Sequence, residues 1–202
     1  QYVFVLPKGR ATKDPILSTE YQYEETYAGG ILAIANHVSS FVDQVTVVTL
    51  LGDKEPRLEF VQKSLAANVS LQAFTKENSP TIVKKRYVQE SYRKNKLFKV
   101  EFINDQPISP RLTDTIATFF RKEISKYDLV IVGDFGHGFL NAPLRKVIEE
   151  KAKFLAINVQ SNSSNMGYNY FNLYSTCDFR TMNEDEFRLP LQRRFEHIDE
   201  VI

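Results

Sequence analysis

The sequence is poor in the residues that build disulfides and metal centres. It holds one cysteine, Cys177, and three histidines among 202 residues. A single cysteine excludes an internal disulfide and is typical of a protein from the reducing cytoplasm. The Cys/His spacings of zinc sites are absent, as are a P-loop and a nucleophile elbow.

Charge of one sign and long apolar runs are also lacking. The formal net charge is +1, which gives no overall attraction to nucleic acid or to an anionic membrane. No apolar run approaches the ~20 residues that span a bilayer, and the N-terminus has neither the basic n-region nor the cleavage site of a signal peptide. Hydrophobic residues (43%) and charged residues (25%) are in an ordinary globular balance. We therefore expect one α/β domain or a little more, in the cytoplasm, without nucleic-acid or membrane partners.

The two ends of the sequence read as cuts inside a longer protein. The first residue is Gln1 rather than Met, and residues 2–6 have the pattern of a strand already under way. Residues 195–202 end without the Gly or Pro that commonly stops a helix. We expect the chain to be an internal fragment.

From Gly30 onward, predicted helices alternate with short apolar strands, which is typical of a mostly parallel sheet with helices on both faces. By contrast, residues 82–92 and 96–103 alternate charged with apolar side chains, as in a sheet with one wet face. With residues 2–6 and 15–27 they predict a small, separate antiparallel sheet. The remaining strands are expected at residues 45–51, 69–74, 129–132, 154–157 and 178–182, and helices at residues 31–42, 56–66, 110–126, 141–151 and 184–191.

The strongest local signal is Val-Ile-Val-Gly-Asp-Phe-Gly-His-Gly at residues 130–138. Ligands of open α/β sheets bind outside the carboxyl ends of the strands, and Asp134 stands where such a strand ends. Its carboxylate could bond a hydroxyl or hydrated Mg²⁺, and Gly138 allows a ligand to approach the backbone. His137, between two glycines, is a further site candidate. The alternative is a plain turn in which Asp134 caps the next element.

Amide side chains follow the strand expected at residues 154–157. Amides donate and accept hydrogen bonds, as sugar hydroxyls do. We favour Asn158 and Gln160 as ligand-binding residues because they stand closest to the strand end. The alternative is a long polar loop that uses Asn for left-handed turns. The amide residues are Asn158, Gln160, Asn162, Asn165 and Asn169.

Asn183 and Glu186 share a face of a helical turn just past the short strand at residues 178–182. An amide and a carboxylate so placed can orient a hydrated Mg²⁺ ion. The alternative is a capping box, with Asn183 as the N-cap and Glu186 at the third helical position.

Two weaker signals lie in the first half of the chain. The pair Gly29 and Gly30 opens a helix and leaves backbone N–H groups free for a ligand. Lys84 and Arg86 alternate along one strand, so that they share a face and could clamp a phosphate. The alternative for the two cations is a solvated, charged edge strand.

In this order the segments resemble the PfkB (ribokinase-like) carbohydrate kinases, and among them the kinase domains of bifunctional ADP-heptose synthases. Gly29 and Gly30, an Ala-rich helix, a Val-rich strand and Leu-Gly-Asp at residues 51–53 resemble the family's first signature. Pro-Thr-Ile-Val-Lys-Lys-Arg at residues 80–86 resembles the heptose kinases' Pro-Thr-x-x-Lys-x-Arg strand, whose basic residues lie near the substrate phosphate. Residues 134–138 resemble their Asp-Tyr-x-Lys-Gly stretch. The Asn-Glu-Asp-Glu sequence at residues 183–186 matches the family's Asn-x-x-Glu motif, tied to magnesium and phosphate.

The resemblance implies a three-layer α/β/α fold with a mostly parallel sheet and a small antiparallel β lid, incomplete at both ends. Residues 1–28 and 78–105 would form the lid, and residues 29–77 and 106–202 the partial core. The implied activity is ATP- and Mg²⁺-dependent phosphorylation of a sugar or sugar phosphate. The lid is also expected to form a homodimer through its aromatic residues, because an exposed aromatic patch usually marks an interface. These aromatics are Tyr21, Tyr23, Tyr27, Tyr87, Tyr92 and Phe98.

The sequence departs from the family pattern at several positions. Ala33 stands where the family has a sugar-binding Asn, His137 replaces a lysine, and Asn158 with Gln160 replaces an Asp-Pro-Lys stretch. The Gly-Ala-Gly-Asp motif, which carries the catalytic base, is expected beyond Ile202, so this fragment is expected to be inactive. A non-catalytic sugar- or nucleotide-sugar-binding module derived from a kinase is the alternative function.

Overall fold

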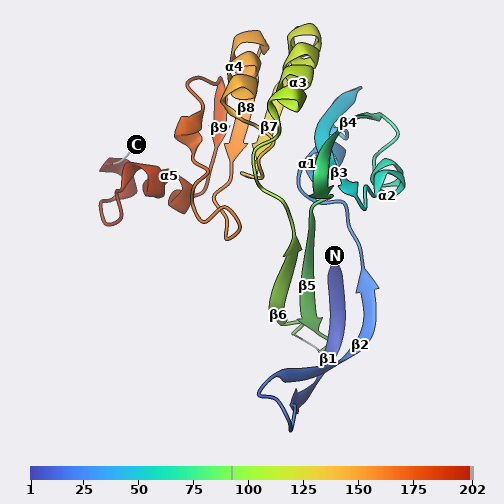
Figure 1. Ribbon diagram of the computed structural model, residues 1–202. Coiled ribbons are helices and arrows are strands. Elements are labelled where there is room, and N and C mark those ends of the chain that lie inside the picture. Colours follow the sequence, from blue (N-terminus) through green and yellow to red (C-terminus); the bar gives the residue numbers. More distant parts are fainter. Residues whose placement is uncertain (92, 201–202) are drawn as a thin grey trace. The chain divides into compact units, whose positions relative to one another are not determined.

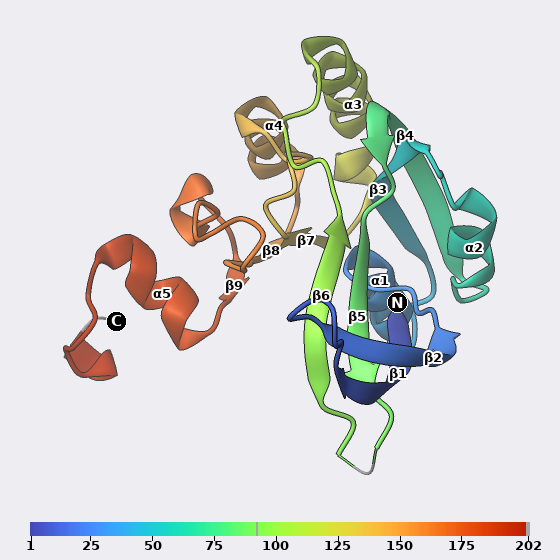
Figure 2. The same ribbon diagram turned by 60° about the horizontal axis from the view of Figure 1, so that its bottom comes forward.

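The computed structural model describes residues 1–91 and 93–200, so Tyr92 lies outside the described residues. The chain forms two compact units, Gln1–Ile103 and Asn104–Ile202. Each unit combines strands with helices (Figures 1 and 2). No helix among the described residues is long and apolar enough to cross a bilayer.

The first unit contains a four-stranded sheet, which we call the lid sheet. Its strands are β1 (Tyr2–Arg10), β2 (Leu17–Glu25), β5 (Val83–Gln89) and β6 (Lys96–Phe102), in the order β2-β1-β5-β6. The hairpins β1–β2 and β5–β6 are antiparallel, as expected. The central pair, β1 with β5, is parallel, so the sheet is mixed rather than wholly antiparallel. Two hairpins that are distant in sequence meet along these central strands (Figure 2).

The same unit holds a second, parallel sheet of β3 (Val45–Lys54) and β4 (Val69–Pro80). Helices α1 (Ile31–Val38) and α2 (Leu58–Lys63) accompany it. Ala35, Val47 and Val69 form its buried core. Helix α1 is shorter than expected because the chain turns after Ser39, whose N–H donates to Ala35 O. Phe41 lies within the helix predicted over residues 31–42, but it falls beyond the end of α1 and is 76% exposed.

The second unit has a parallel sheet of β7 (Val130–Asp134), β8 (Leu155–Val159) and β9 (Phe179–Thr181). Its α-helices are α3 (Pro110–Glu123), α4 (Ala142–Lys151) and α5 (Glu184–Leu191). Ser109 and Asn141 cap α3 and α4 with their side-chain oxygens, each ahead of a proline in the first turn. Ile116, Leu144 and Ile157 are almost fully buried. The short 3₁₀ helices are η1 (Ile124–Lys126), η2 (Phe171–Leu173) and η3 (Ile198–Glu200).

Candidate functional site

The segments that follow the three strands of the second unit meet at one edge of their sheet. Asp134 ends β7 and pairs with Val159 of β8. Just beyond β8, Gln160 N donates to Asp134 O at 2.8 Å. Ser161 N donates to Glu186 Oε1 at 3.2 Å, which ties the start of α5 to the same loop. The parallel pairing thus gathers most of the site candidates of this unit, as the sequence predicts.

Asp134 is only 5% exposed and its carboxylate is surrounded by donors. Oδ1 accepts from Gly136 N at 3.0 Å and from Asn169 Nδ2 at 3.3 Å, and Oδ2 accepts from the Tyr174 hydroxyl at 2.9 Å. Burial, followed by the charge of Asp134, raises the pKa of Tyr174, so its hydroxyl stays protonated and donates. The carboxylate thus fixes the loops of its own unit through three hydrogen bonds.

The glycines after β7 are required by close packing and by backbone angles. Gly136 has φ +69°, and a Cβ there would lie 2.7 Å from atoms of Asn165 and Asn169. Gly138 has φ +76°, and its Cβ would lie 2.2 Å from Gln106 O. Both angles favour glycine, and the chain itself fills the space beside them. His137 is half-buried between these two glycines.

The amide-rich segment folds into a loop held by its own side chains. Asn165 Nδ2 donates to Gln160 O and Phe135 O, and Asn169 Nδ2 donates to Asp134 O. Asn162 Oδ1 accepts from Asn165 N. Asn158 donates from Nδ2 to Thr181 O at 3.0 Å and to its Oγ1 at 3.2 Å, across the β8–β9 pair.

The alternative interpretation of this segment was a long polar loop that uses Asn for left-handed turns. Hydrogen bonds of the asparagines do hold the loop, but its left-handed residues are Met166 (φ 49°) and Gly167 (φ 80°) and none of the asparagines. Gln160 takes part through its backbone, and its side chain is half-buried.

Asn183 and Glu186 form the capping box that the sequence allowed. Asn183 Oδ1 accepts from Glu186 N at 2.8 Å, and Glu186 Oε2 accepts from Asn183 N at 2.9 Å. Glu186 is 4% exposed, and its other oxygen accepts from Ser161 N. A carboxylate has about four lone-pair positions, so each oxygen can accept a second hydrogen bond. This arrangement suits a water-mediated role toward Mg²⁺ better than direct ligation.

Over residues 1–91 and 93–200, no group of three or more His, Cys, Asp and Glu side chains is arranged to hold a metal ion. Mg²⁺ commonly keeps several waters and is bound by one or two carboxylates together with substrate phosphates. A magnesium ion at the capping box would therefore need the phosphates of a bound nucleotide.

In the lid sheet, Lys84 and Arg86 share one face, as the alternation predicts. Across the β5–β6 pair, Lys84 faces Glu101 and Arg86 faces Lys99. Glu101 Oε1 lies 3.5 Å from Lys84 Nζ and 2.8 Å from Lys99 Nζ. Arg86 lies over the ring of Tyr2, 5.7 Å from its centroid. Sequence reasoning missed Lys99 and Glu101 because the register across a hairpin cannot be read from one strand.

Gly29 and Gly30 precede α1. Gly30 is the N-cap with φ 56°, an angle that glycine adopts at little cost, and no side chain caps the helix. A Cβ on Gly29 would have no atom within 4 Å. The space beside Gly29 is therefore open within this unit, unlike the space beside Gly136 and Gly138.

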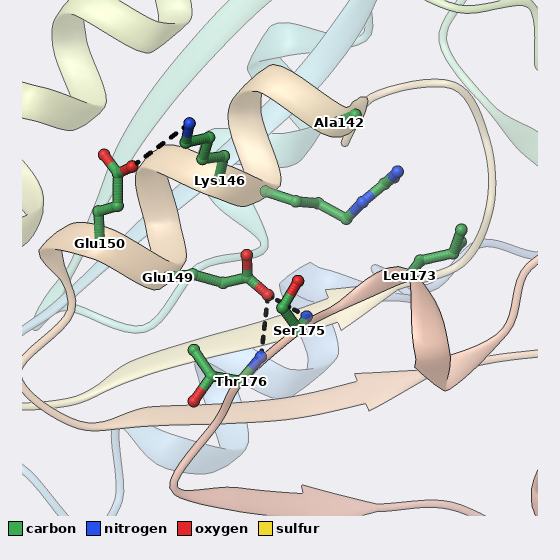
Figure 3. Close-up of a pocket in the computed structure, with 8 residues that line it drawn as sticks. Ala142, Lys146, Glu149, Glu150, Leu173, Ser175 and Thr176 are labelled. Carbon is green, nitrogen blue, oxygen red and sulfur yellow. Dashed lines mark hydrogen bonds and ion pairs between the residues drawn. The ribbon is translucent and has the colours of Figure 1, made fainter.

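A pocket of about 420 Å³ lies beside α4 (Figure 3). Glu149 holds one of its walls by accepting hydrogen bonds from the backbone N–H groups of Ser175 and Thr176. Lys146 and Glu150 pair at 3.9 Å on the helix. None of the candidate site residues lines this pocket, so we do not place the function there.

No protein-family model matches the chain. Among curated proteins, the bifunctional protein HldE of Shewanella loihica is 24% identical over 182 residues, which are 90% of this chain and 36% of that protein. The bifunctional protein HldE of Nitratiruptor sp. is 22% identical over 138 residues, 68% of this chain and 29% of that protein. The chain thus spans about a third of the length of these relatives.

Solved structures of sugar kinases align with nearly all residues of the chain. Phosphofructokinase-2 of Escherichia coli in complex with fructose-6-phosphate aligns with a TM-score of 0.62 and 12% identity, over 99% of this chain and 63% of that chain. Ribokinase of Giardia lamblia aligns with a TM-score of 0.56 and 13% identity, over 99% and 60% of the two chains. These matches confirm the ribokinase-like fold and the resemblance to PfkB carbohydrate kinases. At such identities they show the fold and leave the reaction to be tested.

Proposed function

We propose that this chain is part of an ATP- and Mg²⁺-dependent cytoplasmic kinase that phosphorylates a sugar or sugar phosphate. The observation that carries the proposal is the agreement of two comparisons. The sequence relatives are bifunctional HldE proteins, and the fold neighbours are a phosphofructokinase and a ribokinase. The cationic face of the lid sheet supports a phosphorylated substrate.

In the first unit, Lys84 and Arg86 are proposed to bind the phosphate of the substrate. Arg86 offers a planar guanidinium fork that matches a phosphate group, while Lys84 supplies a point charge. Gly29 and Gly30 are proposed to let the sugar approach the backbone ahead of α1, since the space beside Gly29 is open.

In the second unit, Asn158, Gln160 and His137 are proposed to contact the sugar. Asp134 and Gly138 were expected to do the same, and we propose that Asp134 acts mainly by fixing the loop that presents its neighbours. Asn183 and Glu186 are proposed to orient water around a nucleotide-bound Mg²⁺ ion. The metal would neutralise charge that develops on the transferred phosphoryl group.

Self-association through the lid sheet is part of the same proposal. Tyr87 and Phe98 stack at 4.4 Å on the face opposite to Lys84 and Arg86, and Phe98 is 49% exposed. Exposed aromatic patches of this kind favour an interface. Light scattering at micromolar concentration should give twice the monomer mass of 23.3 kDa. A mass of one chain under these conditions would contradict the dimer.

A non-catalytic sugar- or nucleotide-sugar-binding module is the second candidate. It is favoured by Ala33, His137 and Asn158, which stand where the kinases carry Asn, Lys and an Asp-Pro-Lys stretch, and by the engaged carboxylate of Asp134. The decisive test is ADP release by the full-length protein from ATP-Mg²⁺ with heptose, ribose or hexose phosphates. Turnover supports the kinase. Binding of the same sugars by thermal shift without any turnover supports the binding module.

A further inference from the structure

Helix α4 presents two cations followed one turn later by two carboxylates. Arg145 and Lys146 stand four residues ahead of Glu149 and Glu150, the spacing at which opposite charges on a helix pair. All four side chains line the pocket beside α4. Lys146 Nζ lies 3.9 Å from Glu150 Oε1, whereas Arg145 makes no ion pair with Glu149 or with any other described residue.

Glu149 is held by the opposite wall of the pocket rather than by Arg145. Its Oε1 accepts hydrogen bonds from the backbone N–H groups of Ser175 and Thr176 (Figure 3). These bonds engage one oxygen of the carboxylate, and a carboxylate has about four lone-pair positions. The other oxygen, Oε2, therefore keeps its capacity to accept, on a side chain that lines the pocket.

Arg145 is held in place but only partly paired. Its Nη1 donates to Leu140 O, and its guanidinium lies over the ring of Tyr174, 5.8 Å from the centroid. Tyr174 is 2% exposed and its hydroxyl donates to Asp134, so the ring is a fixed support. Over residues 1–91 and 93–200, the buried Nε of Arg145 has no hydrogen-bond partner. A guanidinium offers five N–H donors, and a buried donor without a partner is rare in folded proteins.

The lining of this pocket suits a ligand that carries one charge of each sign. Its charged side chains are two cations and two carboxylates, so they provide no net attraction for a phosphate dianion. The planar fork of Arg145 matches a carboxylate, and the unengaged oxygen of Glu149 can accept from an ammonium group. Leu173 and Ala142 add apolar surface. The volume of about 420 Å³ is that of a small-molecule site.

We infer that the pocket beside α4 binds a small zwitterion of the α-amino acid class, with its carboxylate on Arg145 and its ammonium group on Glu149. The ligand bridges two opposite charges that line one pocket, one helical turn apart, without pairing with each other. Its side chain lies against Leu173. The site uses none of the residues proposed to bind the sugar, the phosphate or the magnesium ion, so the inference does not depend on the proposed function.

The experiment is isothermal titration calorimetry, with thermal shift in parallel, on the whole 202-residue chain. The probes are free leucine, N-acetylleucine, which lacks the ammonium group, leucinamide, which lacks the carboxylate, and inorganic phosphate. The variants are Arg145→Gln, Arg145→Lys and Glu149→Gln, whose new side chain keeps an oxygen for the N–H groups of Ser175 and Thr176. Lys151→Gln is the matched control, because Lys151 is an exposed cation at the end of α4 that does not line the pocket.

Free leucine should bind to the native chain and raise its melting temperature. N-acetylleucine, leucinamide and phosphate should bind about tenfold more weakly or less, because each leaves one charge of the pocket without its partner. Arg145→Gln and Glu149→Gln should each weaken leucine binding about tenfold or more. Arg145→Lys should weaken it as well, since an ammonium group lacks the fork, and Lys151→Gln should bind as the native chain does. Without ligand, Glu149→Gln should melt close to the native temperature, which shows that this variant folds.

Four outcomes would overturn the inference. Binding of N-acetylleucine as tight as that of leucine would show that the ammonium group is not recognised. Binding of phosphate without binding of leucine would make the pocket a plain anion site. Leucine binding that survives both Arg145→Gln and Glu149→Gln would place the ligand elsewhere, and no leucine binding at millimolar concentration would remove the site. None of these results bears on the phosphorylation of a sugar, which ADP release tests separately.

Discussion

At the scale of single residues, the carboxylate of Asp134 shows that a strand-end aspartate can be recognised from sequence while its hydrogen-bond partners cannot. The sequence places it correctly at the carboxyl end of β7. Its partner Tyr174 is 40 residues further along the chain, beyond a long loop, and no periodicity connects the two. A buried carboxylate that accepts three hydrogen bonds organises the loops around it. The contribution of Tyr174 can be measured directly.

Tyr174→Phe removes the hydroxyl that donates to Asp134 and leaves the ring in place. The buried Oδ2 then lacks this donor, which should lower the free energy of unfolding by about 1–3 kcal/mol. Urea denaturation followed by circular dichroism measures the change. Tyr168→Phe is the matched control, because Tyr168 is 83% exposed and its loss of a hydroxyl should cost less than about 0.5 kcal/mol. Equal stability of the two variants would contradict the role given to Tyr174.

Asp53, near the end of β3, predicts a pH dependence in the first unit. Its carboxylate accepts from Asn78 N at 2.8 Å and Ser79 N at 3.0 Å, and these hydrogen bonds lower its pKa. A depressed carboxyl pKa contributes stability above the unfolded value of about 3.9, and this stability is lost as the pH falls through the lower, folded value.

Asp53→Asn should therefore destabilise the protein at pH 7, and its difference from the native chain should shrink below about pH 4. Urea denaturation at pH 7, 5 and 3 tests this. Asp14→Asn, an exposed change in the turn between β1 and β2, is the control and should follow the native curve. A difference for Asp53→Asn that stays constant across this range would refute the assignment.

At the scale of elements, the sequence left two interpretations open for the start of α5: a magnesium motif and a capping box. The Asn-x-x-Glu spacing fits the kinase motif, and the structure shows a capping box with the same residues. Glu186 adds a bond to Ser161 N, so the cap also anchors the loop after β8. A substitution that keeps an N-cap oxygen but removes the amide can distinguish the capping role of Asn183 from its role in the kinase motif.

Asn183→Ala should lower the free energy of unfolding by about 1 kcal/mol, because the N–H of Glu186 loses its acceptor. Asn183→Ser keeps an N-cap oxygen and should stay within a few tenths of a kcal/mol of the native chain. Chemical denaturation of both variants gives the comparison. If serine proved as costly as alanine, capping would not explain the need for this amide.

Strand positions were predictable to the extent that local pattern determines them. The charged alternation of residues 82–92 and 96–103 indicated β5 and β6, and the apolar runs indicated β3, β7 and β8. The parallel contact of β1 with β5 was not predictable, because it depends on how two distant hairpins meet. The position of Lys99 opposite Arg86 could not be predicted either, because it follows from the register between β5 and β6 and not from the sequence of β6 alone.

At the scale of the whole molecule, the sequence motifs identified the fold. Collinear glycine, basic and Asn-x-x-Glu segments are enough to specify a ribokinase-like arrangement, which the comparisons confirm. They cannot specify which side chains reach a ligand. The Nδ2 group of Asn158 donates to Thr181 and Oδ2 of Asp134 accepts from Tyr174, so ligand binding has to rely on the hydrogen-bonding capacity that these side chains keep.

We predict that the 202-residue chain binds a sugar phosphate and does not transfer a phosphoryl group. The kinase family places its base in a Gly-Ala-Gly-Asp motif, and no Gly-x-Gly-Asp sequence occurs among these residues. Asp134 is a poor substitute base, because its oxygens accept three hydrogen bonds in a buried site. Groups that only bind the sugar stabilise the ground state and the transition state alike, which does not speed the chemical step.

The measurement is ADP release from ATP-Mg²⁺ with ribose 5-phosphate or a heptose phosphate, using the native chain and Asp134→Asn side by side. Both should remain at the background rate, because neither offers a base on the acceptor hydroxyl. Thermal shift on the same samples must show binding by the native chain, so that an absent signal reflects missing chemistry rather than missing substrate. Turnover by the native chain that Asp134→Asn abolishes would make Asp134 the base and would overturn its assignment as the organiser of this sheet edge.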